Sequence, residues 1–395
     1  MGLYPARSVE RAMTFQEVIL RAMSKQITWW QAAEILGMTP RNIRRYKQRL
    51  EKWGYEGLLD GRTRRPSARK VPFALLEKVL LLYRERYFDF NVRHFHEKLR
   101  DEHGLTLSYT WVKNALQQAG LVAKRKKRGR HHKRRPRRPL AGMLIHIDGS
   151  EHAWLGPEHG RFDLITVMDD ATSEIYYARF VEEESTDTVM AALRAVVERQ
   201  GVFCALYSDR ASHFVHTSKA GNRPDRDVRT QVGRALDQLG IELIPAGSPQ
   251  ARGRCERSYG TLQGRLPQEL RAAGVDSVEG ANAFLADYLP RHNARFTVTP
   301  EEQGTAFVPY RGEDLDKIFS KHHERVVGND NTVTFGKLKL QIERQTFRFS
   351  MAKCRVLVCQ HLDGTISVHY GPNLLGRYDA AGESLGSSSR RTSAA

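Results

Sequence analysis

Three acidic residues stand at positions where an α/β fold gathers reactive side chains. Asp148 lies at the end of the first predicted strand, within GMLIHIDGS, Asp209 ends the predicted strand CALYSD, and Glu256 lies near the start of a helix predicted from about Gly253 to Ala272. Carboxylates brought together at such a sheet edge repel one another unless a cation balances them. Hard oxygen ligands favour Mg²⁺ or Mn²⁺. The pattern therefore predicts that Asp148, Asp209 and Glu256 are metal ligands.

Glu256 is the one acid in a strongly basic stretch, SPQARGRCERSYGTLQGRL. On a helix, apolar residues four positions apart predict a buried stripe of Leu262, Leu266 and Leu270. The opposite face is predicted to be exposed and consists of Arg252, Glu256, Tyr259 and Gln263. We expect Arg252, Arg254 and Arg257 to hold DNA phosphates beside the carboxylates. Taken alone, Glu256 also fits a solvated glutamate stabilised by the helix dipole.

The overall charge points to a polyanionic partner. The chain has 395 residues and a formal net charge of +18, from 63 Lys and Arg against 45 Asp and Glu, which makes double-stranded DNA the first candidate. Four cysteines without a CxxC pair argue against a disulfide framework and a structural zinc site. The sequence shows no signal-peptide core and no apolar run of about 18 residues. We therefore expect a cytoplasmic, nucleoid-associated protein without a membrane partner.

Two helical modules are predicted before residue 123. In residues 1–65, Thr28 and the pair Thr39-Pro40 mark helix starts on either side of a turn at Gly37, as in a helix-turn-helix unit. The last helix carries residues that suit a DNA major groove, namely Arg41, Asn42, Arg44, Arg45 and Lys47. Residues 72–122 repeat the pattern as a second helix-turn-helix or winged-helix unit, with candidate DNA contacts at Tyr109, Thr110 and Lys113. A plain helical bundle with a solvated basic face is the alternative for both modules.

Residues 123–139 form a predicted basic linker. The stretch KRKKRGRHHKRRPRR offers no apolar face that could pack. Two DNA-reading modules before it favour a tether that follows DNA phosphates over a solvated spacer. The candidate phosphate contacts are Lys124, Arg125, Lys126, Lys127, Arg128 and Arg130.

The rest of the chain predicts an α/β core and a small β domain. Residues 140–310 begin with three strands, a helix and a fourth strand, which indicates a mixed sheet covered by helices. Residues 320–380 alternate apolar and polar residues around Asn-Asp-Asn and Asp-Gly turns, as in a small antiparallel barrel or sheet. Residues 381–395 are too polar to fold. We therefore expect a multidomain protein with α-helical N-terminal modules, an α/β core and an all-β C-terminal domain.

The motifs HIDGS, YSDRASHF and SPQARGRCERSYGTLQGRL resemble the acidic motifs of insertion-sequence transposases with a retroviral-integrase-type DDE core, of the ISNCY-type group. The resemblance covers most of the chain, and the third motif is the most specific. It implies an RNase H-like core in which Asp148, Asp209 and Glu256 are the catalytic triad and hold two Mg²⁺ or Mn²⁺ ions. It also implies binding to terminal inverted repeats, DNA cleavage and strand transfer into target DNA, by a homodimer or a higher oligomer.

Some features depart from the family pattern. Gly149 follows Asp148 where many relatives carry a larger residue, and the insertion HTSKAGNRPDRDVR lengthens the gap of 47 positions between Asp209 and Glu256. No His/His/Cys/Cys zinc module is found, so recognition of DNA ends is expected to depend on the helix-turn-helix units. A catalytically silent DNA-binding regulator would share the basic half without needing the acids. A metal-dependent nuclease without strand transfer would keep them.

The remaining polar residues near these motifs have weaker claims to function. Asp169 and Asp170 fit a hairpin turn, in which such side chains bind their own backbone. Glu151 and Asp163 fit a solvated surface better than a place beside the metal. His213, four residues after Asp209, is a candidate for substrate contact or for assisting a metal-bound water.

Overall fold

A computed structural model describes residues 6–59, 71–124, 136–216, 228–246, 253–312 and 314–386. The chain divides into two compact units, Met1–Lys78 and Val79–Ala395. The expected basic linker and the C-terminal tail lie largely outside the described residues.

The first unit contains the predicted helix-turn-helix. Helices α1 (Ala6–Met23), α2 (Trp29–Ile35) and α3 (Pro40–Trp53) are followed by the short 3₁₀ helix η1 (Gly54–Leu58). Thr28 forms a capping box with Gln31, and the Thr39 side chain accepts a hydrogen bond from the Asn42 main-chain N–H. Gly37 has a φ of +60° in the turn between α2 and α3, a conformation that favours glycine. Fully buried Ile19 and Ile43 join α1 to α3 in one apolar core.

A second three-helix module follows, and its first helix spans the border between the two units. It consists of α4 (Phe73–Glu85), α5 (Val92–Asp101) and α6 (Tyr109–Gln118). The Asn91 and Ser108 side chains cap α5 and α6 by accepting main-chain hydrogen bonds. Aromatic rings fill its core, notably Tyr83, Tyr87, Phe90 and Phe95.

The core is a five-stranded mixed sheet in the order β3-β2-β1-β4-β5. Its strands are β1 (Ile145–His152), β2 (Phe162–Asp169), β3 (Ile175–Val181), β4 (Ala205–Ser208) and β5 (Glu242–Pro245). The first three pair antiparallel, whereas β4 is parallel to both β1 and β5. The predicted mixed sheet is therefore confirmed.

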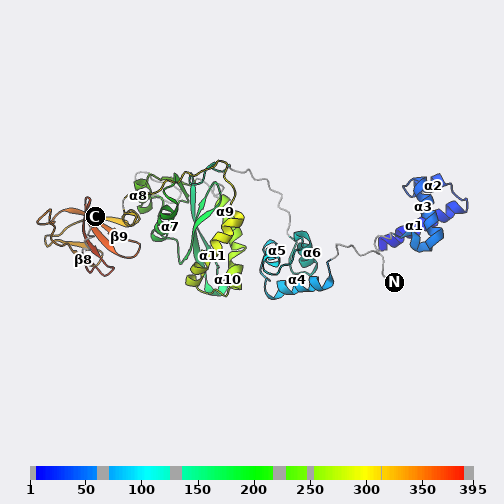
Figure 1. Ribbon diagram of the computed structural model, residues 1–395, viewed down its shortest axis with the longest axis horizontal. Coiled ribbons are helices and arrows are strands. Elements are labelled where there is room, and N and C mark those ends of the chain that lie inside the picture. Colours follow the sequence, from blue (N-terminus) through cyan, green and yellow to red (C-terminus); the bar gives the residue numbers. More distant parts are fainter. Residues whose placement is uncertain are drawn as a thin grey trace, which may run out of the picture. The chain divides into compact units, whose positions relative to one another are not determined.

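Helices cover both faces of this sheet (Figure 1). On one face, α7 (Thr186–Gln200) and α8 (Gln231–Gln238) pack on inward-facing residues such as Ile145 and Val167. On the other, α9 (Gly253–Gln263), α10 (Leu266–Ala272) and α11 (Val278–Phe296) pack on Leu164 and Met168. Alternation along β2 directs neighbouring residues to opposite faces, so one strand supplies both cores.

Two expectations about the long helix were wrong. The helix predicted from Gly253 to Ala272 ends at Gln263 and restarts at Leu266, because Arg265 between the two leaves the helical conformation, with φ −140° and ψ −48°. Tyr259 is buried rather than exposed, since its ring joins the apolar layer under the sheet. The predicted stripe of Leu262, Leu266 and Leu270 is buried as expected.

The C-terminal domain is all-β, as predicted. A four-stranded sheet in the order β11-β10-β9-β6 accompanies a hairpin of β7 and β8. These strands are β6 (Lys321–Val326), β7 (Thr332–Phe335), β8 (Leu338–Gln341), β9 (Arg355–Gln360), β10 (Ile366–Tyr370) and β11 (Asn373–Tyr378). The short helix α12 (Leu315–Ile318) precedes them. Arg234 of α8 donates to the Ser320 carbonyl at 2.6 Å, which attaches this domain to the core.

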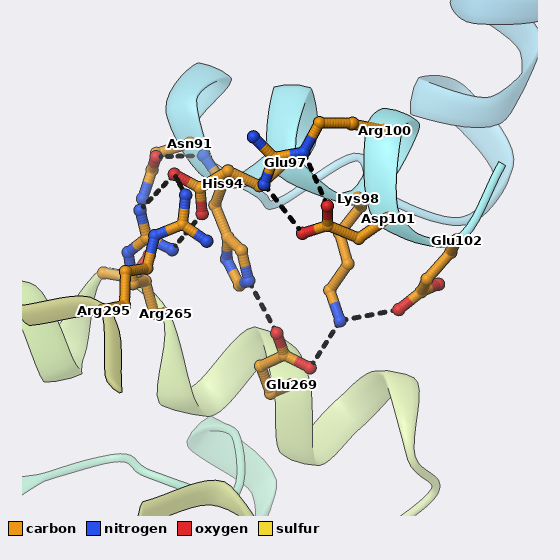
Figure 2. Close-up of polar contacts among 11 residues, drawn as sticks. Asn91, His94, Glu97, Lys98, Arg100, Asp101, Glu102, Arg265, Glu269 and Arg295 are labelled. Atoms are coloured by element: carbon orange, nitrogen blue, oxygen red, sulfur yellow. Dashed lines mark hydrogen bonds and ion pairs between the residues drawn. The ribbon is translucent and has the colours of Figure 1, made fainter. Parts of the chain in front are cut away.

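Ion pairs connect the second helical module to the core helices. Glu97 of α5, only 6% exposed, accepts from both Arg265 and Arg295 at 2.5 Å. Figure 2 shows Glu269 of α10 between two residues of α5, with His94 at 2.7 Å and Lys98 at 2.8 Å. Burial alone would raise the pKa of Glu269, but the hydrogen bonds from His94 and Lys98 outweigh it and lower that pKa to about 2. Charge pairing therefore fixes α5 on α10.

Replacing Glu97 by Gln is expected to lower the free energy of unfolding by about 3 kcal/mol, because it leaves Arg265 without its buried counter-charge. Denaturant unfolding and hydrogen exchange of the α5 amides measure the effect. The control is Asp89→Asn, which breaks a partly exposed pair with Arg271 and should cost less than about 1 kcal/mol. Equal losses in the two variants would show that burial of Glu97 does not matter.

Candidate active site

Strand pairing brings Asp148 beside Asp209. β1 and β4 are parallel, with His146 opposite Tyr207. Continuing that register by two residues places Asp148 next to Asp209, the residue that directly follows β4. Both acids are half-buried, and the Asp209 carboxylate accepts a hydrogen bond from the Ala211 main-chain N–H at 2.9 Å. The sheet therefore sets two of the predicted ligands side by side.

The third acid is positioned by a tyrosine. Glu256 is exposed in the first turn of α9, and buried Tyr259 follows it by three residues, a spacing that keeps both on neighbouring parts of the helix surface. The Tyr259 hydroxyl lies 2.5 Å from the Asp148 main-chain carbonyl and 3.0 Å from that of Leu164. Burial and the nearby Asp148 carboxylate both raise the pKa of Tyr259 well above 10.0. The phenol therefore stays protonated and fastens α9 to β1 at Asp148 itself.

The three carboxylates fit a hard divalent cation by their chemistry and by the placement of their elements. Within the part of the chain that the structure describes, however, no three His, Cys, Asp or Glu side chains gather closely enough to hold a metal ion. Residues 247–252, which lead into α9 just before Glu256, fall outside the described residues. The register and the Tyr259 hydrogen bond thus place the three acids on neighbouring elements, namely β1, the residue after β4 and the first turn of α9, while among the described residues their side chains do not close around a common point.

Asp170 has a different role from the one expected of a turn residue. It is 1% exposed, and its carboxylate lies 2.7 Å from His146 Nε2 and accepts from the Arg138 main-chain N–H at 2.8 Å. It also forms a buried ion pair with Arg254. Burial alone would raise the pKa of Asp170, but the hydrogen bonds from these three residues outweigh it and hold that pKa well below 3.8. The neighbouring Asp169 is equally buried and accepts from Gly142 and Thr172.

Arg254 is not the exposed phosphate contact that the sequence suggested. Its guanidinium is buried, paired with Asp170, and donates to the Pro136 carbonyl at 3.1 Å. It therefore fixes the start of α9, two residues before Glu256, and leaves the set of proposed DNA contacts. Arg257 is exposed, with its Nε bound to the Gly253 carbonyl at 2.8 Å. Arg252 lies outside the described residues.

Glu184, which the sequence did not single out, pairs with His213. The two side chains meet at 2.8 Å and are 20% and 12% exposed. Asp163 lies next to this pair, because its carboxylate accepts from the Glu184 main-chain N–H at 2.8 Å. Glu151, by contrast, forms an exposed pair with Arg161, as expected of a surface residue.

Sequence signals for these residues exist but are weak. His146 interrupts the apolar strand LIHID, and a buried polar residue requires a partner. Nothing in the sequence indicates that the partner is Asp170, 24 residues away. Glu184 stands in the acidic run EEES, where a solvated surface is the ordinary interpretation.

The candidate DNA contacts occupy exposed helix faces. Arg41, Asn42, Arg44 and Arg45 are exposed on α3, and partly exposed Lys47 pairs with Glu51 at 3.3 Å. On α6, Thr110 is exposed, while Tyr109 and Lys113 are partly exposed. Lys124 is exposed, whereas Arg125, Lys126, Lys127, Arg128 and Arg130 lie outside the described residues.

Comparisons with known proteins agree with this architecture. A family model described as a helix-turn-helix domain matches residues 16–67. The putative transposase y4bF of Sinorhizobium fredii (strain NBRC 101917 / NGR234) is 32% identical over 363 residues, which is 91% of this chain and 79% of that protein. The chain belongs to the transposases. A transposase for insertion sequence IS1202 from Streptococcus pneumoniae is 29% identical, over 84% of this chain and 78% of that one.

Solved structures similar to this transposase are more distant. A chain of the simian T-cell lymphotropic virus intasome gives a TM-score of 0.34 at 14% identity, covering 66% of this chain and 91% of that chain. The HTLV-2 integrase catalytic core, solved in complex with magnesium, gives 0.28 at 12% identity, covering 37% and 83%. Among the described residues, no helix is long and apolar enough to cross a membrane.

Replacing Asp170 by Asn is expected to lower the free energy of unfolding by about 3 kcal/mol at pH 7, because Arg254 loses its buried counter-charge. The pKa of Asp170 is depressed on folding, so its stabilisation is present above pH 3.8 and is lost as the pH falls further. Urea unfolding at pH 7 and pH 3.5 should show the difference between variant and wild type shrinking in acid. Glu151→Gln is the exposed control. If Asp170→Asn lowered the free energy of unfolding by the same amount at both pH values, the role of the Asp170 charge would be contradicted.

Proposed function

We propose that this transposase binds the terminal inverted repeats of its own element and cuts and joins DNA at Asp148, Asp209 and Glu256. The observation that carries the proposal is the parallel register of β1 and β4, which sets Asp148 beside Asp209. The bond from Tyr259 to the Asp148 carbonyl, one helical turn from Glu256, supports a common site for all three. A regulator that only bound DNA would not need three acids at one sheet edge.

Asp148, Asp209 and Glu256 would hold Mg²⁺ or Mn²⁺, with two ions per site. When bound, such ions activate a hydroxyl for in-line attack and stabilise charge on the phosphate oxygens. The residues of the chain supply position: the sheet fixes Asp148 and Asp209, and the pair of Arg254 and Asp170 fixes the start of α9. Exposed Arg257 beside Glu256 is suited to a DNA phosphate.

DNA recognition is assigned to the exposed faces of α3 and α6. Both helices begin with a side-chain cap, and α3 carries Arg41, Asn42, Arg44 and Arg45 in its first two turns, the part of a recognition helix that enters a major groove. Lys124 and the basic residues after it are proposed to follow phosphates between these modules and the core. Pairing of two DNA ends calls for at least two copies of the chain.

Asp148→Asn, Asp209→Asn and Glu256→Gln are each expected to reduce cleavage and joining at least ~10²-fold, because each removes a metal ligand. Binding to the element ends should stay nearly intact, since the recognition helices are unchanged. Joining assays with Mg²⁺ or Mn²⁺ and DNA that carries the element ends provide the measurement. Exposed Glu151→Gln on the same strand is the control. Near wild-type joining in any one acid variant would remove that residue from the site, and cleavage without joined products in the wild type would identify a nuclease.

Changing Lys124, Arg125, Lys126, Lys127 and Arg128 together to Ser should weaken specific and non-specific DNA alike. The plot of log affinity against log salt should flatten by about 0.9 for each phosphate that the variant no longer neutralises. Changes to Ala at Arg41, Arg44 or Arg45 should instead cost roughly 1–3 kcal/mol preferentially on the true end. Binding titrations of the full chain over a series of salt concentrations distinguish the two roles. An unchanged salt slope in the linker variant would contradict them.

A further inference from the structure

A fourth acidic side chain, that of Glu184, lies close to the strand that carries Asp148. Glu184 stands between β3 and α7, and His213 stands in the turn that follows β4 and Asp209. Their side chains meet at 2.8 Å, and both are largely buried. The contact therefore joins two segments that are separated by 29 positions in the sequence.

Glu184 is held on its own side of the contact. Its main-chain N–H donates to the Asp163 carboxylate of β2 at 2.8 Å, and the next residue, Ser185, caps α7. Burial raises the pKa of Asp163, and the Glu184 and Glu151 carboxylates raise it further. The backbone of Glu184 is thus tied to β2 and to α7, which leaves its carboxylate little freedom to move.

Gly149 explains how this carboxylate comes so close to β1. A Cβ atom built on Gly149 would overlap the second carboxylate oxygen of Glu184 and would lie 3.2 Å from Ile165 Cδ1. Gly149 lies inside β1 and does not have a positive φ, so a side chain at this position would not strain the backbone but would push the end of the Glu184 side chain aside. Gly149, the residue that follows Asp148 in β1, is therefore the one that leaves room for the Glu184 carboxylate.

His213 belongs to the same tight turn as Asp209. The Asp209 carboxylate accepts from Ala211, and the Ala211 carbonyl accepts from Phe214 at 3.0 Å and from Val215 at 3.1 Å. Phe214 is 2% exposed in the core under the sheet. His213 is thus held between the buried Phe214 and the fixed Glu184, and the turn it belongs to carries Asp209.

We propose that Glu184 and His213 are a positioning pair that holds the turn after β4 against β1, so that Asp209 stays beside Asp148. Gly149 is the third part of this arrangement, because any side chain at that position displaces the Glu184 carboxylate. The proposal rests on the proposed function of Asp148 and Asp209 as ligands of a divalent ion. It assigns Glu184 an action through His213 and the turn, and not direct contact with the ion.

The test measures Mn²⁺ binding to the full chain without DNA, by isothermal titration, alongside thermal unfolding and joining. Glu184→Ala and His213→Ala should each weaken Mn²⁺ binding about 10-fold, as removal of a residue that orients a ligand does. The double variant should be no weaker than either single one, because both remove the same contact. Glu184→Gln, which keeps a hydrogen bond to His213, should bind Mn²⁺ within a few-fold of wild type. Joining by the Ala variants should recover at saturating Mn²⁺.

Gly149→Ala is the test of the close approach. It should weaken Mn²⁺ binding as Glu184→Ala does, and combining the two should add nothing, because the Glu184 side chain is then absent. If the losses of Mn²⁺ affinity in Gly149→Ala and Glu184→Ala were strictly additive in the combined variant, the proposal would be overturned. A loss in Glu184→Gln as large as in Glu184→Ala, with His213→Ala unaffected, would also overturn it, because Glu184 would then be a direct ligand.

Two measurements distinguish positioning from a purely structural role and from an error in the triad. If the pair only stabilised the fold, the unfolding midpoint would fall while Mn²⁺ affinity stayed at the wild-type value, and this result would reject positioning. Asp148→Asn is measured in parallel, because unchanged Mn²⁺ binding in that variant would show instead that the proposed triad is wrong.

Discussion

The buried ion pair between Asp170 and Arg254 is the interaction on which the candidate site depends. Asp170 follows β2, His146 beside it belongs to β1, and Arg254 begins α9. A charge placed in so dry an environment is tolerated only when partners surround it, so these three elements are obliged to meet at one point. Asp148 lies two residues after His146, and Glu256 lies two residues after Arg254. The ion pair between Asp170 and Arg254 therefore fixes the backbone that carries two of the three proposed ligands.

Repulsion among carboxylates shapes the rest of this sheet edge. Asp148, Asp209 and Glu184 are each restrained by a specific contact: the Asp148 carbonyl by Tyr259, the Asp209 carboxylate by Ala211 and the Glu184 carboxylate by His213. Tyr259 contributes a neutral donor that remains protonated beside Asp148. Carboxylates that are held in fixed positions near one another repel, and a bound cation would relieve this repulsion.

Local sequence patterns predicted most of the fold, but they did not predict the contacts between side chains that are far apart in the sequence. Caps at Thr28, Thr39 and Ser108 and the alternation in the C-terminal strands were readable, because they depend on neighbours in sequence. The break at Arg265 and the burial of Arg254 were not, since each is decided by a partner far along the chain, Glu97 and Asp170 respectively. Asp209 and Glu256 were chosen from their places at element ends, where the structure has them, whereas Asp148 lies inside β1, which continues to His152 instead of ending at the acid as predicted. Glu184 could not be chosen in this way, because only the folded chain brings it to Gly149.

The surface between α5 and α10 is built from charges rather than from apolar side chains. Glu97 pairs there with Arg265, and Lys98 pairs with Glu269. If the two surfaces separated, water would solvate the exposed charged groups, and no apolar patch that favours aggregation would be exposed. An apolar seam would make separation costly and prone to aggregation. The contact between α5 and α10 therefore depends on the correct pairing of opposite charges, which a mismatched surface could not supply.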